Sequence, residues 1–307
     1  MRGRSQRMAP SVGASDKGRS RQAAASGLID QAFSSASNVL LVLAVARVTA
    51  PEIFGIFALA YVGTTVCLAA VRGAFGTPIS LRAHSPAHVH LEVRWALRKV
   101  AAVVLPISLI GIPALAWGSA AVSAAGALAL TLPILLAQDL LRFASLALGR
   151  GWTTALADGL WTLVSAGLLV STWLYGSWIS APWLVLIWGA GGVMSLSLLA
   201  VRALRTSAAQ APTDAPSTEV TVGDRGRLGF DASMGAWVAL VVTGVVAWLL
   251  DPLAAAALRG AGTMLGPINV LISSLQAVFV PMMVRRPGAS VEQLLGVAKP
   301  VIVSVAA

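Results

Sequence analysis

Apolar runs of about 20 residues recur along the whole chain, and they constrain its fold more than any other feature. A helix of this length crosses the ~30 Å hydrocarbon core of a bilayer. Lipid offers no hydrogen-bond partners, so each span has to satisfy its own backbone groups, and repeated runs of this kind predict transmembrane helices. We therefore predict an all-α, polytopic membrane helix bundle.

Composition and charge support a membrane protein over a soluble domain with one anchor. Hydrophobic residues make up 57% of the chain and charged residues only 11%, against roughly 25% charged residues in an average soluble domain. The net charge of +10 comes from short basic clusters between apolar runs, which indicates topology and not a nucleic-acid partner. The single cysteine, Cys67, excludes a disulfide framework or a thiolate metal site, and no cofactor is expected.

The pattern predicts about eight complete spans and the start of a ninth. Thr49 to Glu52 reads as a capping box with a proline in the first turn, so the first two spans are expected to form a tight helical hairpin. The ninth run starts at Leu294 and is cut off at Ala307. The expected complete spans are 28–48, 53–71, 100–117, 121–146, 155–174, 183–204, 232–250 and 252–283.

These spans predict two helical lobes joined by a linker. Residues 1–27 are expected to be a disordered, basic cytoplasmic tail and 28–205 a six-helix lobe; 206–228 would be a cytoplasmic linker and 229–307 the incomplete start of a second lobe. A shift of 201 residues lays Asp30 on Asp231 and Pro51 on Pro252. Such a match indicates parallel repeats of the kind found in two-lobed transporters.

The basic residues predict the orientation. With the N-terminus in the cytoplasm, every Lys and Arg except Arg47 and Arg259 falls on the cytoplasmic side of the predicted spans. Trp173, Trp178 and Trp183 flank a predicted outer loop, as interfacial aromatic residues do. We expect a multi-pass protein of the bacterial inner membrane.

Three segments resemble a known family. They are LIDQAFSSASNVLLVLAVARVTAPEIFGIFAL from Leu28, RFASLALGRGWTTALADGLW from Arg142 and GPINVLISSLQAVFVPMMVRR ending at Arg286. They resemble the bacterial polysaccharide flippases of the multidrug/oligosaccharidyl-lipid/polysaccharide exporter superfamily. The resemblance implies two six-helix lobes around a central cavity that moves lipid-linked oligosaccharides across the inner membrane. Implied partners are that substrate and membrane lipids, with other membrane proteins of polysaccharide biosynthesis as candidates.

Charged residues inside the spans are the first candidates for function, because a charge in lipid is costly and usually marks a cavity or a paired network. Asp139 and Arg142 lie three residues apart on one helix face, and Asp158 lies at matching depth on the next span. They are interpreted either as an ion pair that locks the two helices or as an inner gate or entry site for an anionic headgroup.

Polar residues in the first span give further candidates. Asp30 with Gln31, and Asp231 at the start of span 7, are interpreted as helix N-terminal caps, with a cavity role as the alternative. Asn38 lies deeper and is assigned either to an interhelical hydrogen bond or to a cavity wall. The three histidines, His84, His88 and His90, are interpreted as part of a solvated loop rather than a metal site.

Two arginines complete the set of cavity candidates. Arg259 lies seven residues past Pro252, roughly 10 Å into its helix at 1.5 Å per residue. It is expected either to snorkel to the surface or to bind pyrophosphate with two parallel hydrogen bonds, a geometry that lysine reproduces poorly. Arg47 belongs to the first segment that resembles the flippases and is the second candidate.

The sequence therefore predicts a transporter that flips a polyprenyl-pyrophosphate-linked oligosaccharide by alternating access. A multidrug exporter of the same fold is the first alternative, kept open by Asp30. A non-transporting remnant or subunit is the second. A membrane polymerase or ligase is the third, although such enzymes need a large outer loop and every predicted outer loop is short.

Reporter fusions test the predicted orientation. Fusions at residues 90 and 215 are expected to report the cytoplasm and a fusion at residue 178 the outside, because the basic loops alternate in that way. An outside signal at residue 215 would show that a span has been missed or wrongly placed.

Overall fold

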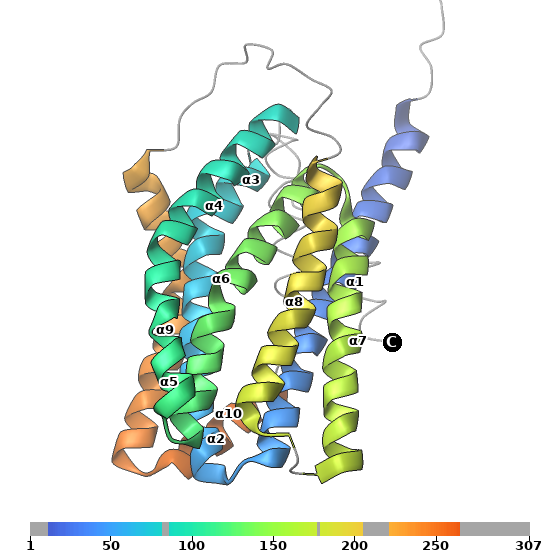
Figure 1. The fold of residues 1–307 in the computed structure, drawn as a ribbon. Coiled ribbons are helices and arrows are strands. Elements are labelled where there is room, and N and C mark those ends of the chain that lie inside the picture. The colour runs from blue at the N-terminus through green and yellow to red at the C-terminus, as the bar shows by residue number, and fades with distance from the viewer. Residues whose placement is uncertain (1–11, 82–85, 177–178, 205–220, 265–307) are drawn as a thin grey trace, which may run out of the picture.

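The protein is a multi-pass helical membrane protein. The computed structural model describes residues 12–81, 86–176, 179–204 and 221–264, whose regular elements are all helices (Figure 1). Seven helical segments within these ranges are long and apolar enough to cross a membrane. This result confirms the predicted all-α bundle, and the seven segments correspond to the first seven predicted spans.

α6, α7 and α8 follow the predicted spans within a few residues. The predicted eighth span begins at Pro252, as α10 does, while its remainder and the ninth lie outside the described residues. The elements are α1 Val12–Val48, α2 Pro51–Val71, the π-helix η1 Arg72–Gly76, α3 Thr77–Leu81, α4 Pro86–Leu109, α5 Gly111–Trp117, α6 Ala120–Ala147, α7 Gly151–Tyr175, α8 Ala181–Leu204, α9 Val222–Leu249 and α10 Pro252–Met264.

Proline explains why the third predicted span is two helices. Pro113 cannot donate to the carbonyl of Leu109, and its ring crowds that carbonyl. The chain accordingly breaks at Ile110, whose N–H donates to the Ile107 carbonyl oxygen at 3.2 Å in a tighter turn. Within the same span, α4 begins at Pro86, so His88 and His90 are helical and the loop interpretation is wrong for them. His84 lies outside the described residues.

Two predicted boundaries need correction because helices extend beyond the apolar runs. α1 begins at Val12, so the segment from 12 to 27 is helical and not part of a disordered tail. α9 begins at Val222, within the predicted linker, where Thr221 and Asp224 form a reciprocal capping box. Helix propagation costs little once a helix is nucleated, so polar flanks can continue a span. The remainder of the predicted tail and linker lies outside the described residues.

The turn between α1 and α2 lacks the predicted capping box. The N-cap residue is Ala50, which has no side chain able to cap, while the Thr49 hydroxyl donates to the Val45 carbonyl oxygen at 2.8 Å. Pro51 does occupy the first turn of α2, as predicted. The proline fixes the backbone for helix initiation without needing a side-chain cap.

The predicted hairpin of α1 and α2 is also wrong. α1 packs mainly along α7, whereas α2 packs mainly against α6, α9 and α10 (Figure 1). The two helices meet near their shared turn, where Leu41 and Val45 of α1 and Phe57 of α2 belong to one buried apolar cluster. They diverge away from that turn, and the space between their diverging halves positions the candidate site.

α6 lies at the centre of the bundle, in contact with α2, α4, α5 and α8. A second apolar cluster, which includes Val93, Leu136, Leu140 and Leu199, packs α6 against α4 and α8. Many large apolar side chains on α4, α5 and α9 are exposed in the isolated chain. This is the pattern expected of helices that face lipid tails.

Glycines allow α10 to approach α2 closely and α9 to approach η1 closely. A Cβ atom at Gly55 would collide with the carbonyl oxygen of Pro252, the first residue of α10. A Cβ atom at Gly73 would collide with the carbonyl oxygen of Leu228 in α9. Small residues at such crossings let the backbones of transmembrane helices approach closely, and the resulting van der Waals packing favours helix association in lipid.

We predict that Gly55→Ala destabilises the protein by roughly 1–3 kcal/mol, because the added methyl group overpacks the α2–α10 contact. Gly63→Ala in the same helix is the matched control, since a Cβ atom there meets no atom within 4 Å. Thermal unfolding of the two purified variants in detergent measures the difference. Equal unfolding temperatures would show that this contact does not hold α10 in place.

Candidate functional site

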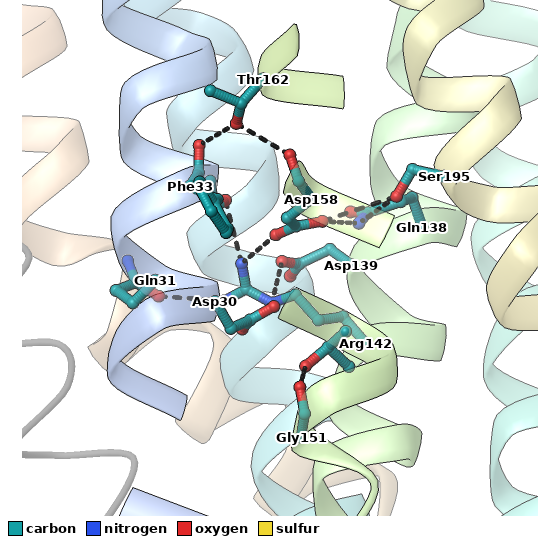
Figure 2. Close-up of polar contacts among 12 residues, drawn as sticks. Asp30, Gln31, Phe33, Gln138, Asp139, Arg142, Gly151, Asp158, Thr162 and Ser195 are labelled. Atoms are coloured by element: carbon teal, nitrogen blue, oxygen red, sulfur yellow. Dashed lines mark hydrogen bonds and ion pairs between the residues drawn. The ribbon is translucent and has the colours of Figure 1, made fainter. Parts of the chain in front are cut away.

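A buried arginine on α6, Arg142, is the centre of the polar site. Only 4% of its surface is exposed. Its guanidinium lies 3.4 Å from a carboxylate oxygen of Asp158 on α7, 3.6 Å from one of Asp30 on α1 and 3.8 Å from one of Asp139 on α6 (Figure 2). A buried guanidinium is tolerated only where opposite charges and hydrogen bonds replace its hydration. One side chain therefore links three helices electrostatically.

Neutral groups of α1 complete the surroundings of Arg142. Its two terminal nitrogens donate to the Ser34 hydroxyl at 3.0 Å and to the Gln31 side-chain oxygen at 3.1 Å. Asp30, Gln31 and Ser34 thus all contact Arg142 from adjacent turns of α1. The sequence predicted an ion pair between the fourth and fifth spans only, and the structure adds the first span to it.

The interpretation of Asp30 and Asp231 as helix caps is wrong. Asp30 lies well inside α1 and is 1% exposed, because α1 begins earlier than the apolar pattern indicated. Asp231 lies inside α9 and is exposed, and the N-cap of that helix is Thr221. Only Asp30 of this pair joins the buried cluster.

Asp158 is held by a second residue of α6 and from one further helix, α8. Its second carboxylate oxygen accepts a hydrogen bond from the Gln138 side-chain amide at 2.6 Å, and Gln138 also donates to the Ser195 hydroxyl of α8 at 3.1 Å (Figure 2). Gln138 and Arg142 lie four residues apart on α6 and so share one face. Because this face meets α1, α7 and α8, the network fixes four helices around one point.

Arg72 is a site residue that sequence reasoning missed. It donates two hydrogen bonds of 2.8 Å to the two carboxylate oxygens of Asp139, in a bidentate ion pair. The sequence pattern ended the second span at Val71, one residue before Arg72. The helical segment instead continues to Ser80 through the π-helix η1, which begins at Arg72. Single π-turns inside helices are frequent at functional sites.

The cluster carries more negative than positive groups. Asp30, Asp139 and Asp158 face Arg72 and Arg142, so one carboxylate is in excess when all five groups are ionised. One oxygen of Asp30 is buried and has no hydrogen-bond partner. The site therefore carries excess negative charge, which favours the binding of a further cation or proton.

A small pocket opens beside the cluster, between the diverging halves of α1 and α2. Its volume is about 30 Å³, which accommodates about two water molecules. Asn38, for which the sequence left two interpretations open, is one of its lining residues. The polar and aromatic lining includes Ser34, Asn38, Tyr61, Arg72, Gln138 and Asp139.

The two remaining candidates lie apart from the cluster. Arg47 is exposed at the end of α1, where its guanidinium stacks 3.6 Å from the ring centre of Trp173 and donates to the Thr172 carbonyl oxygen at 3.3 Å. Arg259 of α10 lies 4.8 Å from the ring centre of Tyr61, and its buried Nε has no hydrogen-bond partner. Tyr61 lines the pocket, so Arg259 is close to the site and Arg47 is not.

Comparison with known proteins identifies the fold. No family model and no curated protein match the sequence significantly. A solved structure of a MOP superfamily transporter from Pyrococcus furiosus is similar over 94% of this chain and 70% of that chain, with a TM-score of 0.69 and 14% sequence identity. The chain therefore has the same helical fold as that structure. For that archaeal protein, a reverse polarity of the binding pocket is said to suggest a different function.

Substitution of Arg142 tests its role as the centre of the network. Arg142→Leu leaves Asp30 and Asp158 buried without a cation, and we expect a loss of roughly 3–5 kcal/mol in stability. Arg47→Leu is the control, because an exposed cation–π contact contributes only about 0.5–1 kcal/mol. Thermal unfolding in detergent compares the variants. The assignment fails if Arg142→Leu unfolds at the temperature of the control.

Proposed function

We propose that the protein is an alternating-access transporter of the bacterial inner membrane that flips a polyprenyl-pyrophosphate-linked oligosaccharide. The observation that carries the proposal is a polar, charged pocket between α1 and α2 in a chain that shares the helical fold of a MOP superfamily transporter. Charged and polar groups at membrane depth cost free energy, and a helix bundle that needs only a stable core can do without them. A pathway for a polar substrate does need them.

The size of the pocket supports a mechanism with moving lobes. Room for about two water molecules is far too little for an oligosaccharide. Transport therefore requires a second arrangement with a larger space beside this pocket, which the proposal places between the two lobes. The network around Arg142 holds α1, α6, α7 and α8 together, so the first lobe would move as a rigid unit against α9 and α10.

The choice of an anionic lipid-linked substrate rests on the family resemblance and on Arg259. A pyrophosphate group needs cationic hydrogen-bond donors, and arginine provides them in a planar fork. Arg259 stacks on pocket-lining Tyr61 and forms no ion pair with a carboxylate of the described residues. In this mechanism the sugar occupies the wet cavity while the polyprenyl tail stays in lipid.

A multidrug exporter that takes organic cations is the second candidate. The observation in its favour is the excess carboxylate of the cluster, together with the unpartnered oxygen of buried Asp30. A cationic substrate would be attracted to this charge imbalance. The two candidates differ in the sign of the substrate charge and therefore respond oppositely to the loss of a positive side chain near the pocket.

Export assays on Arg259 variants separate the two candidates. The variants are expressed in a strain that lacks its own flippase, and polysaccharide export is measured. Arg259→Ala is expected to abolish export at normal protein levels. Arg259→Lys is expected to restore it only partly, because lysine cannot form the bidentate contact. Arg98→Ala, which removes an exposed arginine of α4, is the control. Wild-type export by the alanine variant would make Arg259 an interfacial anchor. Efflux of organic cations without any oligosaccharide export would favour the second candidate.

A further inference from the structure

We infer that Arg225 of α9 and Glu92 of α4 form a latch, which holds the first lobe against α9 in this arrangement and opens during transport. The inference rests on the proposed function for the movement of the lobes, but not for the identity of the substrate. The latch lies toward the end of the bundle where α1, α4 and α9 begin (Figure 1), which the basic loops predict to be cytoplasmic.

Arg225 binds to residues of the first lobe. One of its terminal nitrogens donates to the two carboxylate oxygens of Glu92, at 2.7 and 3.1 Å, and the other donates to the Ala74 carbonyl oxygen of η1 at 3.5 Å. The guanidinium also lies 4.7 Å from the ring centre of Trp95 on α4. Trp95 packs against Phe75 of η1, with the ring centres 5.6 Å apart. These partners of an α9 side chain therefore all belong to α4 and η1.

The same face of α9 continues into a close contact with α2 and η1, which we call the seam. Arg225, Gly229 and Ser233 are buried and lie four residues apart, so they share one face of the helix. A Cβ atom at Gly229 would lie 3.0 Å from the Ala70 carbonyl oxygen near the end of α2. The ion pair therefore lies at the outer edge of a tightly packed seam.

An ion pair at this edge can separate and form again. The Glu92 side chain is 21% exposed, so water already reaches it and can hydrate both charges when α9 moves away. Hydration then offsets much of the lost Coulomb attraction. The network around Arg142 is almost fully buried and lies within the first lobe. That network holds one lobe together, whereas the Arg225 pair joins this lobe to its neighbour.

The π-helix η1 connects the latch to the pocket. Its first residue, Arg72, lines the pocket and pairs with Asp139 of α6. Two residues later, the Ala74 carbonyl oxygen accepts a hydrogen bond from Arg225. Separation of α9 from the first lobe therefore removes contacts from the segment that carries part of the pocket wall. Rigid-body movement between lobes is the usual way in which such interfaces switch.

Thiol labelling of the purified full-length protein in detergent tests the inference. Cys67, the single cysteine of the sequence, is replaced by serine in the parent protein. Ser233→Cys then places a reporter in the seam, eight residues from Arg225 or about 12 Å along the helix. A water-soluble maleimide is expected to label it slowly, because Ser233 is 1% exposed. Glu92→Gln and Arg225→Gln are each expected to speed labelling about tenfold, since each removes one charge of a charge-assisted hydrogen bond.

Three controls accompany the labelling. Arg227→Gln, which removes an exposed arginine of the same helix, should label at the parent rate. The double variant Glu92→Gln/Arg225→Gln should label no faster than the single variants, because both groups act through one contact. A second reporter, Ser165→Cys, is fully buried inside the first lobe and should stay unlabelled in every variant.

Cross-linking distinguishes a latch that opens from a seam that is permanent. A short thiol cross-linker with a reducible bond is attached between Glu92→Cys and Arg225→Cys in the Cys67→Ser protein. We expect the cross-link to stop export and its reduction to restore export, because the lobes cannot separate while they are joined at this point.

The inference is overturned if Ser233→Cys labels at the parent rate in both glutamine variants, or if cross-linked protein still exports. Labelling of Ser165→Cys in those variants also overturns it, because the ion pair would then stabilise the whole fold and not one seam. Labelling does not depend on the substrate. If it follows the expectation and the parent exports no oligosaccharide, the proposed function fails and the latch stands. If the parent exports but labelling is unchanged in the glutamine variants, only the latch fails.

Discussion

The arrangement of the first lobe depends on the burial of one guanidinium group. Arg142 is almost entirely removed from solvent and is compensated by Asp30, Asp139 and Asp158 from three helices. At membrane depth, an uncompensated charge costs more than most packing interactions provide. α1 and α7 therefore have to bring their carboxylates to α6, and this requirement explains why α1 packs along α7 and not along α2.

α1 and α2 diverge because their side chains pack differently at the two ends of the pair. Near the shared turn, apolar residues such as Leu41, Val45 and Phe57 pack into one cluster. Gly55 at this end of α2 lies against Pro252 of α10. Farther from the turn, polar side chains line the space beside α2, and Gly73 of η1 lies against Leu228 of α9. Apolar packing at one end and polar surfaces at the other leave a pocket that is narrow in this arrangement.

Much of the fold could be predicted from the sequence, but less of the site. The positions of the first seven spans, the helix class and the tight turn at Pro51 are local properties, because apolar length and proline geometry act within one segment. Asp139, Arg142 and Asp158 were recognisable as intramembrane charges. Arg72 was not, because it directly follows an apolar run and a π-turn that continues the helix leaves little signal in the sequence.

The sequence by itself determined that the chain crosses a membrane several times and that charges are buried there, since these conclusions require only the cost of placing polar groups in lipid. The tertiary structure decided which helices pair and which charges meet. Arg72 and Asp139 are separated by 67 residues, and Arg142 and Gln31 by 111. Such partners are selected by packing of the whole bundle, because helix periodicity relates only residues within a few turns of each other.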